Sequence, residues 1–254
     1  MPHDALIGHT GFVGSNLLAQ RPFTATFNSA TIDSIDGRAF EEVVCAGVSA
    51  VKWWANQNPD EDRARIESLM RHLEHIRADR FTLISTIDVY DPPLAVTEDD
   101  EPQAQHPYGA NRIMLERFVA ECFPLHQIIR LPALFGSGLK KNAIYDLMHN
   151  NRIELINPAA AFQWYPLDRL GQDLQTARTQ PVTHLNLATE PLTMEAIRTR
   201  CFPTLQLSIQ ASPPAHYDMH SLHAEALGGS GAYLMDRTAV LNAIAHFVAT
   251  NTPP

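Results

Sequence analysis

The stretch DALIGHTGFVGSNLLAQ, residues 4–20, decides the fold. It contains a short apolar strand that ends at Gly8, three glycines spaced three residues apart, and the beginning of a helix. In such a turn the first glycine bends the chain off the strand, the second lets the backbone approach a pyrophosphate, and the third lets helix and strand pack closely. The helix N-terminus then faces the phosphates.

This stretch therefore predicts a dinucleotide site, and an ordinary glycine-rich turn is the alternative. The residues expected to hold the cofactor here are Gly8, Thr10, Gly11, Phe12, Val13 and Gly14.

Strand-like and helix-like segments alternate beyond this turn. Further strands are expected at 23–27, 42–46, 81–85, 127–131 and 184–187, and helices at 14–19, 60–78 and 108–123. This alternation predicts an α/β fold, a Rossmann-type doubly wound parallel sheet with a small C-terminal substrate lobe. We expect residues 1–135, completed by about 163–190, to form the NAD(P)-binding domain, and residues 136–162 and 191–254 to form the lobe. The proline- and acid-rich segment 91–107 is expected to be a solvated connection.

Composition excludes several classes of protein. The formal net charge is −9 and no basic run occurs, which argues against a nucleic-acid partner. Neither a signal peptide nor a membrane span is expected from the apolar segments. The three cysteines have no C-x-x-C spacing, so we expect no disulfide framework and a cytoplasmic protein. His216, His220 and His223 have helical spacing but no evident fourth ligand, so no metal site is predicted.

The end of the second expected strand bears on the choice of cofactor. An acid at this position usually binds the adenosine ribose, but this chain has Asn28 and Ser29 there. A carboxylate would repel a 2′-phosphate, whereas these two side chains can donate hydrogen bonds to one. The sequence therefore favours NADP over NAD, the alternative being that Asp33 reaches the ribose.

Two later segments extend the pattern: ISTIDVY at residues 84–90 and PYGANR at 107–112. With the glycine turn, they resemble the extended short-chain dehydrogenases/reductases, which include nucleotide-sugar epimerases, dehydratases and reductases. That family carries a Ser-Ser/Thr-x-x-Val-Tyr strand end and a Tyr-x-x-x-Lys helix. Residues 130–136 and 164–170 resemble two further family segments, and the likeness covers about the first two-thirds of the chain.

The resemblance implies the catalytic roles. Thr86 would hydrogen-bond a substrate carbonyl or hydroxyl, and Tyr108 would exchange its proton while hydride passes between substrate and nicotinamide. A tyrosine ionises near pH ~10 in water, so a cation is needed to lower its pKa. The family uses the lysine four residues on, but this chain has Arg112 there. We expect Arg112 to face the cofactor ribose and lower the Tyr108 pKa; the alternative is a surface pair with Glu116.

Other positions take roles from the same resemblance. Cofactor contacts are expected from Ala46, Gly47, Tyr108, Arg112, Leu131 and Pro132, and substrate contacts from Lys52, Asp88, Asn142 and Trp164. A solvated surface charge is the alternative for Lys52. Ile87 replaces an acid of the sugar dehydratases, which disfavours dehydration. Phe162 falls where many members place an arginine on the nucleotide diphosphate, which weakens the case for a nucleotide sugar.

The favoured function is NAD(P)-dependent oxidation, reduction or epimerisation at a hydroxyl/carbonyl carbon of a sugar or sugar-like small molecule. The family often dimerises through a pair of helices, so a homodimer is compatible with the resemblance. The alternative is a catalytically retired NAD(P)-binding sensor or regulatory subunit, kept open by Arg112 and Phe162. The presence of both Thr86 and Tyr108 argues against it.

Overall fold

The computed structural model describes residues 3–208 and 213–251. Expectations touching residues 1–2, 209–212 or 252–254 lie outside this range. The chain divides into two compact units. The first unit takes the described residues of Met1–Asp91, Asp100–Arg130 and Leu170–Leu185, and the second those of Pro92–Asp99, Leu131–Arg169 and Asn186–Pro254.

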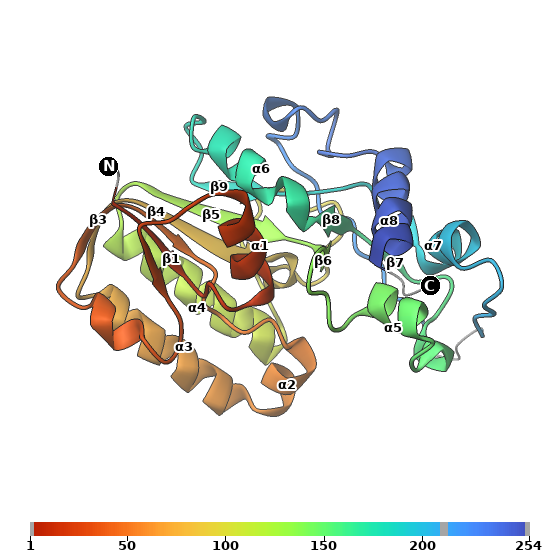
Figure 1. The fold of residues 1–254 in the computed structure, drawn as a ribbon, viewed down its shortest axis with the longest axis horizontal. Coiled ribbons are helices and arrows are strands. Elements are labelled where there is room, and N and C mark those ends of the chain that lie inside the picture. Colours follow the sequence, from red (N-terminus) through yellow and green to blue (C-terminus); the bar gives the residue numbers. More distant parts are fainter. Residues whose placement is uncertain (1–2, 209–212, 252–254) are drawn as a thin grey trace. The chain divides into compact units, whose positions relative to one another are not determined.

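A six-stranded sheet forms the centre of the first unit (Figure 1). Its order is β2 (Ala25–Phe27), β1 (Asp4–Ile7), β3 (Ala39–Cys45), β4 (Arg77–Thr86), β5 (His126–Leu131) and β9 (His184–Asn186). The strands run parallel, as in the pairs β1–β2, β1–β3 and β3–β4. The expected Rossmann-type α/β sheet is thus confirmed. Because β2 and β3 lie on opposite sides of β1, the strand order reverses there, and such a switch point is where α/β sheets bind ligands.

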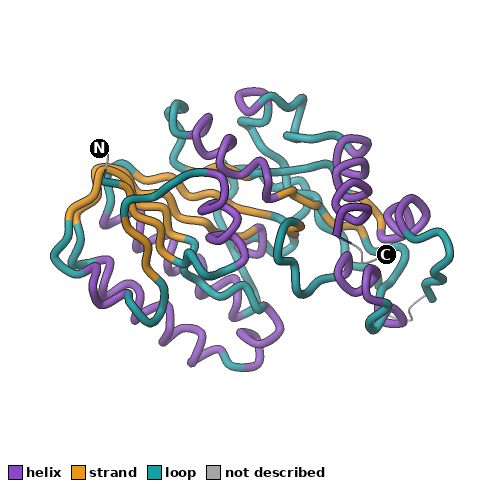
Figure 2. The backbone as a smooth tube through the Cα atoms, in the orientation of Figure 1, coloured by secondary structure: helices purple, strands orange, loops and turns teal. Residues whose placement is uncertain are grey.

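Helices cover both faces of this sheet (Figures 1 and 2). α3 (Pro59–Leu73) and α4 (Pro107–Cys122) lie on one face, while α1 (Phe12–Gln20) and α6 (Leu170–Ala177) lie on the other. α2 (Lys52–Gln57) follows β3, and the 3₁₀ turns η1 (Ile32–Ile35) and η2 (Ile87–Val89) follow β2 and β4. The apolar side chains of β3, β4 and α4, including Val43, Phe81 and Leu115, fill the core beneath α3 and α4.

Two helix boundaries differ from the sequence prediction. α1 begins at Phe12 because Gly11 already serves as its N-cap in an extended conformation. α3 ends at Leu73, five residues before the predicted end at residue 78, because Arg77 and Ala78 pair with β3 as the first residues of β4. The apolar Ile76, which had appeared to continue the helical period, is buried in the core just before that strand.

The described part of the second unit contains two small sheets and three helices of its own. β6 (Ala133–Phe135) pairs in parallel with β8 (Trp164–Pro166), and β7 (Ala161–Phe162) pairs antiparallel with β10 (Leu192–Thr193). The helices are α5 (Ala143–His149), α7 (Met194–Cys201) and α8 (Arg237–Asn251), and the 3₁₀ turns are η3 (Ile153–Leu155), η4 (Leu167–Arg169) and η5 (Glu225–Leu227). No helix in the described ranges is long and apolar enough to cross a membrane.

Part of the loop expected to be a solvated connection belongs to this second unit. Residues 92–99 are held there by Glu98, whose carboxylate accepts hydrogen bonds from the Asn186 and Leu222 backbone N–H groups, both at 2.8 Å, and from Ser221 Oγ at 2.7 Å. An acid in a proline-rich loop is thus a structural anchor here.

Candidate active site

The glycine turn joins β1 to α1 at the carboxyl edge of the sheet. Gly8 has φ 86°, and a Cβ at this residue would lie 2.3 Å from the Ala46 carbonyl oxygen. A Cβ on Gly14 would lie 2.1 Å from the Gly8 oxygen, whereas the nearest atom to a Cβ on Gly11 is the Gly8 oxygen at 3.3 Å. The chain itself therefore requires Gly8 and Gly14. At Gly11 a Cβ would make a tight contact with the Gly8 oxygen, but a much less severe one than at Gly8 or Gly14.

The other residues expected at the cofactor surround this turn. Thr10 lies within it, and Phe12 and Val13 begin α1. Ala46 and Gly47 follow β3 directly, and the Ala46 N–H donates to the Ile7 carbonyl at 2.9 Å. A Cβ on Gly47 would meet the Ile7 side chain at 2.9 Å, so this glycine permits the close approach of the two strand ends.

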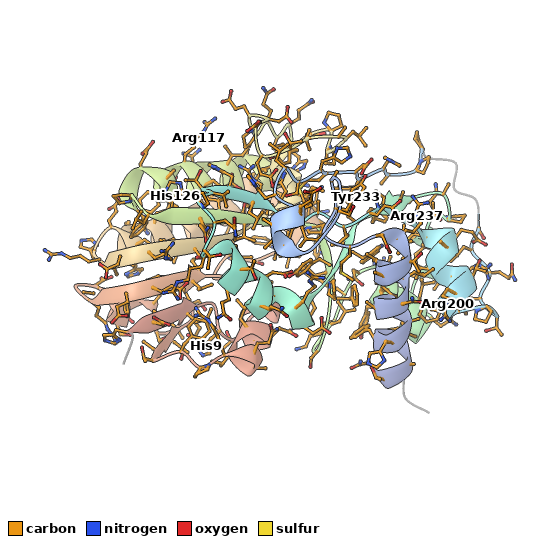
Figure 3. All side chains as sticks on the ribbon, turned by 90° about the horizontal axis from the view of Figure 1, so that it is seen from above. His9, Arg117, His126, Arg200, Tyr233 and Arg237 are labelled. Carbon is orange, nitrogen blue, oxygen red and sulfur yellow. The ribbon has the colours of Figure 1, made fainter. Side chains whose placement is uncertain are left out.

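The end of β2 has no carboxylate, as the sequence indicated. The Asn28 side-chain oxygen accepts hydrogen bonds from the Ala30 N–H at 2.9 Å and from Thr31 Oγ1 at 3.3 Å, and Ser29 is exposed in the same turn. His9 (Figure 3) places its Nδ1 3.0 Å from the carbonyl oxygen of Phe27, the last residue of β2. Asp33 lies further along, in η1.

Thr86 and Tyr108 come together in the first unit. Thr86 is the last residue of β4 and Tyr108 is the second residue of α4. The Thr86 hydroxyl hydrogen-bonds to the Tyr108 hydroxyl, and the Tyr108 N–H donates to Asn56 Oδ1 at 3.0 Å. His106 caps α4 by accepting the Gly109 N–H at 3.0 Å.

Gly109 explains how the helix reaches the strand end, a requirement that sequence reasoning had missed. A Cβ at this position would lie 2.2 Å from the Asp88 carbonyl oxygen, so only glycine lets the first turn of α4 approach η2 this closely. The signal was present in the sequence as the glycine directly after the tyrosine.

Opposing influences act on the Tyr108 phenol. Burial raises its pKa above the ordinary value, and this is the largest effect. The positive charge of Arg112 lowers the pKa, as do the hydrogen bond from Thr86 and the charge of Lys52, whereas the negative charge of Asp88 raises it. The phenol is thus held in its neutral form unless the nearby cations offset burial.

Arg112 is buried in the first unit. Its guanidinium forms an ion pair with Asp62 of α3, donates to the Ser49 carbonyl at 2.5 Å, and lies over the Tyr108 ring, 3.9 Å from the ring centroid. The alternative of an exposed pair with Glu116 is wrong, because Glu116 pairs with Arg130 at 2.7 Å. The cation thus contacts the face of the phenol ring, and its charge is matched by a buried carboxylate.

Lys52 and Asp88, expected to touch substrate, are paired with each other. The Lys52 ammonium at the start of α2 lies 2.6 Å from Asp88 Oδ1. Asp88 Oδ2 lies 3.4 Å from the Thr86 hydroxyl, and the Asp88 N–H donates to the same hydroxyl at 3.2 Å. Both charged groups therefore adjoin the Thr86–Tyr108 pair. The next residue of α2, Trp53, is 64% exposed.

The remaining predicted residues, with Leu131 and Pro132 at the end of β5 among them, belong to the second unit. Leu131 ends that strand and Pro132 follows it. Asn142 caps α5 by accepting the Tyr145 N–H at 3.0 Å, and its amide nitrogen donates to the Leu134 carbonyl at 2.8 Å. Trp164 is buried in β8 beside Phe162, with ring centroids 6.0 Å apart. The structure thus gives Asn142 and Trp164 contacts within their own unit.

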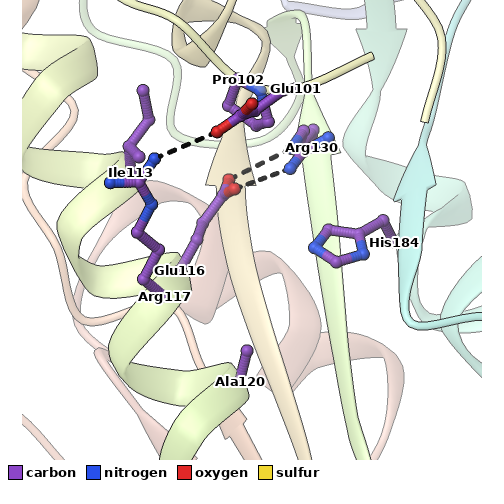
Figure 4. A pocket seen from close by; sticks show the side chains of 8 residues that line it. All are labelled: Glu101, Pro102, Ile113, Glu116, Arg117, Ala120, Arg130 and His184. Carbon is purple, nitrogen blue, oxygen red and sulfur yellow. Dashed lines mark hydrogen bonds and ion pairs between the residues drawn. The ribbon is translucent and has the colours of Figure 1, made fainter. Parts of the chain in front are cut away.

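A cavity of about 120 Å³ lies elsewhere in the first unit, between α4 and the sheet (Figure 4). It is lined by Glu101, Pro102, Ile113, Glu116, Arg117, Ala120, Arg130 and His184, and so by none of the predicted site residues. Arg130 binds both Glu116 oxygens, at 2.7 and 3.2 Å, and donates to the Tyr90 hydroxyl at 2.5 Å. Ser85 also hydrogen-bonds to Glu116. This buried network ties α4 to β4 and β5, and sequence spacing gave no sign of it.

Comparison with known proteins places this architecture. No family model and no curated protein matches the chain in sequence. Among solved structures, UDP-glucose 4-epimerase from Thermotoga maritima in complex with UDP-glucose superposes with a TM-score of 0.75 at 13% identity, covering 97% of each chain. The chain therefore shares its fold with this enzyme, as the resemblance to the extended short-chain dehydrogenases/reductases predicted.

Two further structures with this fold carry cofactors. The dTDP-4-dehydrorhamnose reductase of Bacillus anthracis in complex with NADP has a TM-score of 0.75 at 13% identity, over 99% of this chain and 100% of the other. A Bordetella bronchiseptica enzyme in complex with NAD and UDP has a TM-score of 0.74 at 10% identity, over 99% of this chain and 95% of the other. The fold shared with these structures thus covers 99% of this chain.

Proposed function

We propose that this protein is an NAD(P)-dependent oxidoreductase or epimerase that acts on a hydroxyl/carbonyl carbon of a sugar or sugar-like metabolite. The observation that carries the proposal is the hydrogen bond between Thr86 and Tyr108 at the end of β4. In a parallel sheet the carboxyl ends of all strands share one edge, so this pair lies at the same edge as the glycine turn after β1.

The roles follow from the chemistry of each group. Tyr108 gives its phenolic proton to the substrate oxygen, or takes it back, and Thr86 holds that oxygen by a hydrogen bond. The nicotinamide, when bound, supplies or accepts the hydride. Arg112 lowers the Tyr108 pKa through its charge, but because a guanidinium does not release its proton at working pH, it acts without proton transfer.

We further propose that NADP is the preferred cofactor. The turn after β2 offers Asn28 and Ser29, and no carboxylate there repels a 2′-phosphate. Structures with this fold hold either NAD or NADP, so the argument rests on these residues alone.

The structures that superpose on this chain include enzymes of sugar nucleotides. We nevertheless propose the wider class of sugar or sugar-like substrates. The reason is Phe162, an aromatic side chain in β7 where an arginine would be expected to bind a diphosphate.

A second candidate is a retired NAD(P)-binding regulator. It is favoured by the ion pair of Arg112 with Asp62, which matches the only positive charge in the Tyr-x-x-x-Arg motif. Fluorescence titration with NADPH and NADH, followed by turnover assays on a panel of sugars and alcohols, separates the two. For an enzyme, Tyr108→Phe lowers turnover by ~10²–10⁴-fold with cofactor affinity kept. Cofactor binding with equal inactivity of wild type and variant across the panel would support the regulator.

A further inference from the structure

The protein contains only three lysines, Lys52, Lys140 and Lys141, and none occupies the fourth position after Tyr108. Arg112 occupies it, with its charge matched by Asp62 and its guanidinium over the ring face. A lysine in another element nevertheless adjoins the same site. Lys52 begins α2, 56 residues before the tyrosine, and its ammonium is 2.6 Å from Asp88.

We propose that the Lys52–Asp88 ion pair is the positioning device of Tyr108, taking over the part of the missing motif lysine. Asp88 fixes the Thr86 hydroxyl toward the phenol, and Lys52 supplies the cation that cancels the Asp88 charge. This inference rests on the proposed function, since it assigns the residues that prepare its acid–base group.

The hydrogen bonds of Thr86 support the claim that Asp88 positions its hydroxyl. A threonine hydroxyl has one hydrogen to donate. Thr86 Oγ1 accepts the Asp88 N–H at 3.2 Å and donates to Asp88 Oδ2 over a long distance, 3.4 Å, near the limit for a hydrogen bond. Lys52 draws the other carboxylate oxygen to 2.6 Å. Because Lys52 holds the carboxylate, its hydrogen bond with Thr86 stays long, and the Thr86 hydroxyl also hydrogen-bonds to Tyr108.

The charges around Tyr108 support the claim that Lys52 cancels the charge of Asp88. The charged groups that face the phenol are Arg112 on its own helix, Asp88 of η2 and Lys52 of α2. Burial lowers the pKa of His106, whose ring centroid is 6.3 Å from that of Tyr108, and so favours the uncharged imidazole. Arg112 is matched by Asp62, so an unpaired Asp88 would be the excess charge of the site. Lys52 removes that excess.

Access to solvent separates Lys52 from Arg112. The Lys52 side chain is 36% exposed, whereas that of Arg112 is 5% exposed. The Lys52 ammonium is therefore partly in contact with solvent, and replacing Lys52 leaves the Asp88 carboxylate, whose side chain is 16% exposed, without this partner.

The test measures Tyr108 ionisation directly and needs no substrate. All six tyrosines are replaced by 3-fluorotyrosine, whose phenol ionises at lower pH, and the ¹⁹F resonance missing in Tyr108→Phe is assigned to Tyr108. We expect Lys52→Met to shift the Tyr108 midpoint to higher pH, Lys52→Arg to restore it, and Asp88→Asn to shift it to lower pH. Lys140→Met, which removes an exposed lysine of the second unit, is the control and leaves the midpoint unchanged.

Three outcomes would overturn the inference: a Lys52→Met midpoint equal to that of the control, a Lys52→Arg midpoint as displaced as that of Lys52→Met, or a wild-type Tyr108 that does not ionise before the protein unfolds. Circular dichroism checks the fold, and Asp88→Asn provides the opposite shift if Lys52→Met fails to fold. NADPH and NADH titrations on the same samples keep the two claims apart. Absent cofactor binding refutes the proposed function, while the fluorine midpoints still decide the role of Lys52.

Discussion

Replacement of Asp62 by alanine tests the buried pair beneath Tyr108. The side chains of Asp62 and Arg112 are 4% and 5% exposed, and Asp62 also accepts the Asn111 side-chain N–H at 2.9 Å. Asp62→Ala leaves a guanidinium in the core without a counter-charge. Removing one partner of a buried pair costs about 3–5 kcal/mol, because the remaining charge is desolvated and uncompensated.

For a chain of this size, each kcal/mol lowers the melting temperature by about 2–4 °C. The expected decrease for Asp62→Ala is therefore roughly 6–20 °C in a calorimetric scan at neutral pH. Glu61→Ala is the matched control on the same helix. Glu61 pairs with Arg65 at 2.6 Å, but both side chains are more than half exposed, so its loss is expected to cost less than about 1 kcal/mol.

The double variant Asp62→Leu/Arg112→Met completes the experiment. Because it removes both charges and keeps side-chain volume, it is expected to melt at a higher temperature than Asp62→Ala. If Asp62→Ala melts within the range of Glu61→Ala, the pair contributes nothing to stability, and Asp62 is not the counter-charge that Arg112 needs in the core.

The remaining predictions concern the cofactor and the phenol. Gly11→Val is expected to abolish the fluorescence change on NADPH addition, because its side chain would occupy the place of the pyrophosphate. Its Cβ would lie 3.3 Å from the Gly8 oxygen, a tight contact that a small backbone shift relieves, so the circular dichroism spectrum is expected to be kept. Gly14→Ala, whose Cβ would lie 2.1 Å from the same oxygen, is expected to lose stability instead. The dissociation constant for NADP⁺ is expected to be lower than that for NAD⁺, and the reverse order would show that an acid such as Asp33 reaches the ribose. The Asp62→Leu/Arg112→Met variant lacks the charge of Arg112, which lowers the Tyr108 pKa. The limb of its pH–rate profile that depends on the phenolate is therefore expected to move to higher pH. Its cofactor dissociation constant is also expected to rise. An unchanged limb would mean that Lys52 alone sets this pKa.

The sequence predicted those features that depend on residues close together along the chain. The spacing of Gly8, Gly11 and Gly14 between a strand and a helix predicted the turn that begins the sheet. The structure explains the spacing, because a Cβ on Gly8 or Gly14 would collide with backbone atoms. The period of Asp60–Leu73 predicted α3, although the apolar Ile76 extended the predicted helix into what is the approach to β4.

Contacts between distant segments were not predictable in this way. Asp62 is one of three acids in the first turn of α3, a position that helix electrostatics alone explain. Only the packing of α3 against α4 selects it as the partner of Arg112, 50 residues away. The same holds for Lys52 and Asp88, because they are 36 residues apart in the sequence and belong to no common motif.

Residues 92–99 belong to the second unit although the segments before and after them belong to the first, and this limits which fragments of the protein can be prepared. Each unit is assembled from three segments, so the chain passes between units at five points: after residues 91, 99, 130, 169 and 185. A fragment truncated after residue 130 would lose the last segment of the first unit, and it would expose Glu98 without the Ser221 and Leu222 groups that it binds in the intact chain. To isolate the first unit, a short polar linker would therefore have to replace residues 92–99, and residue 170 would have to follow directly after residue 130.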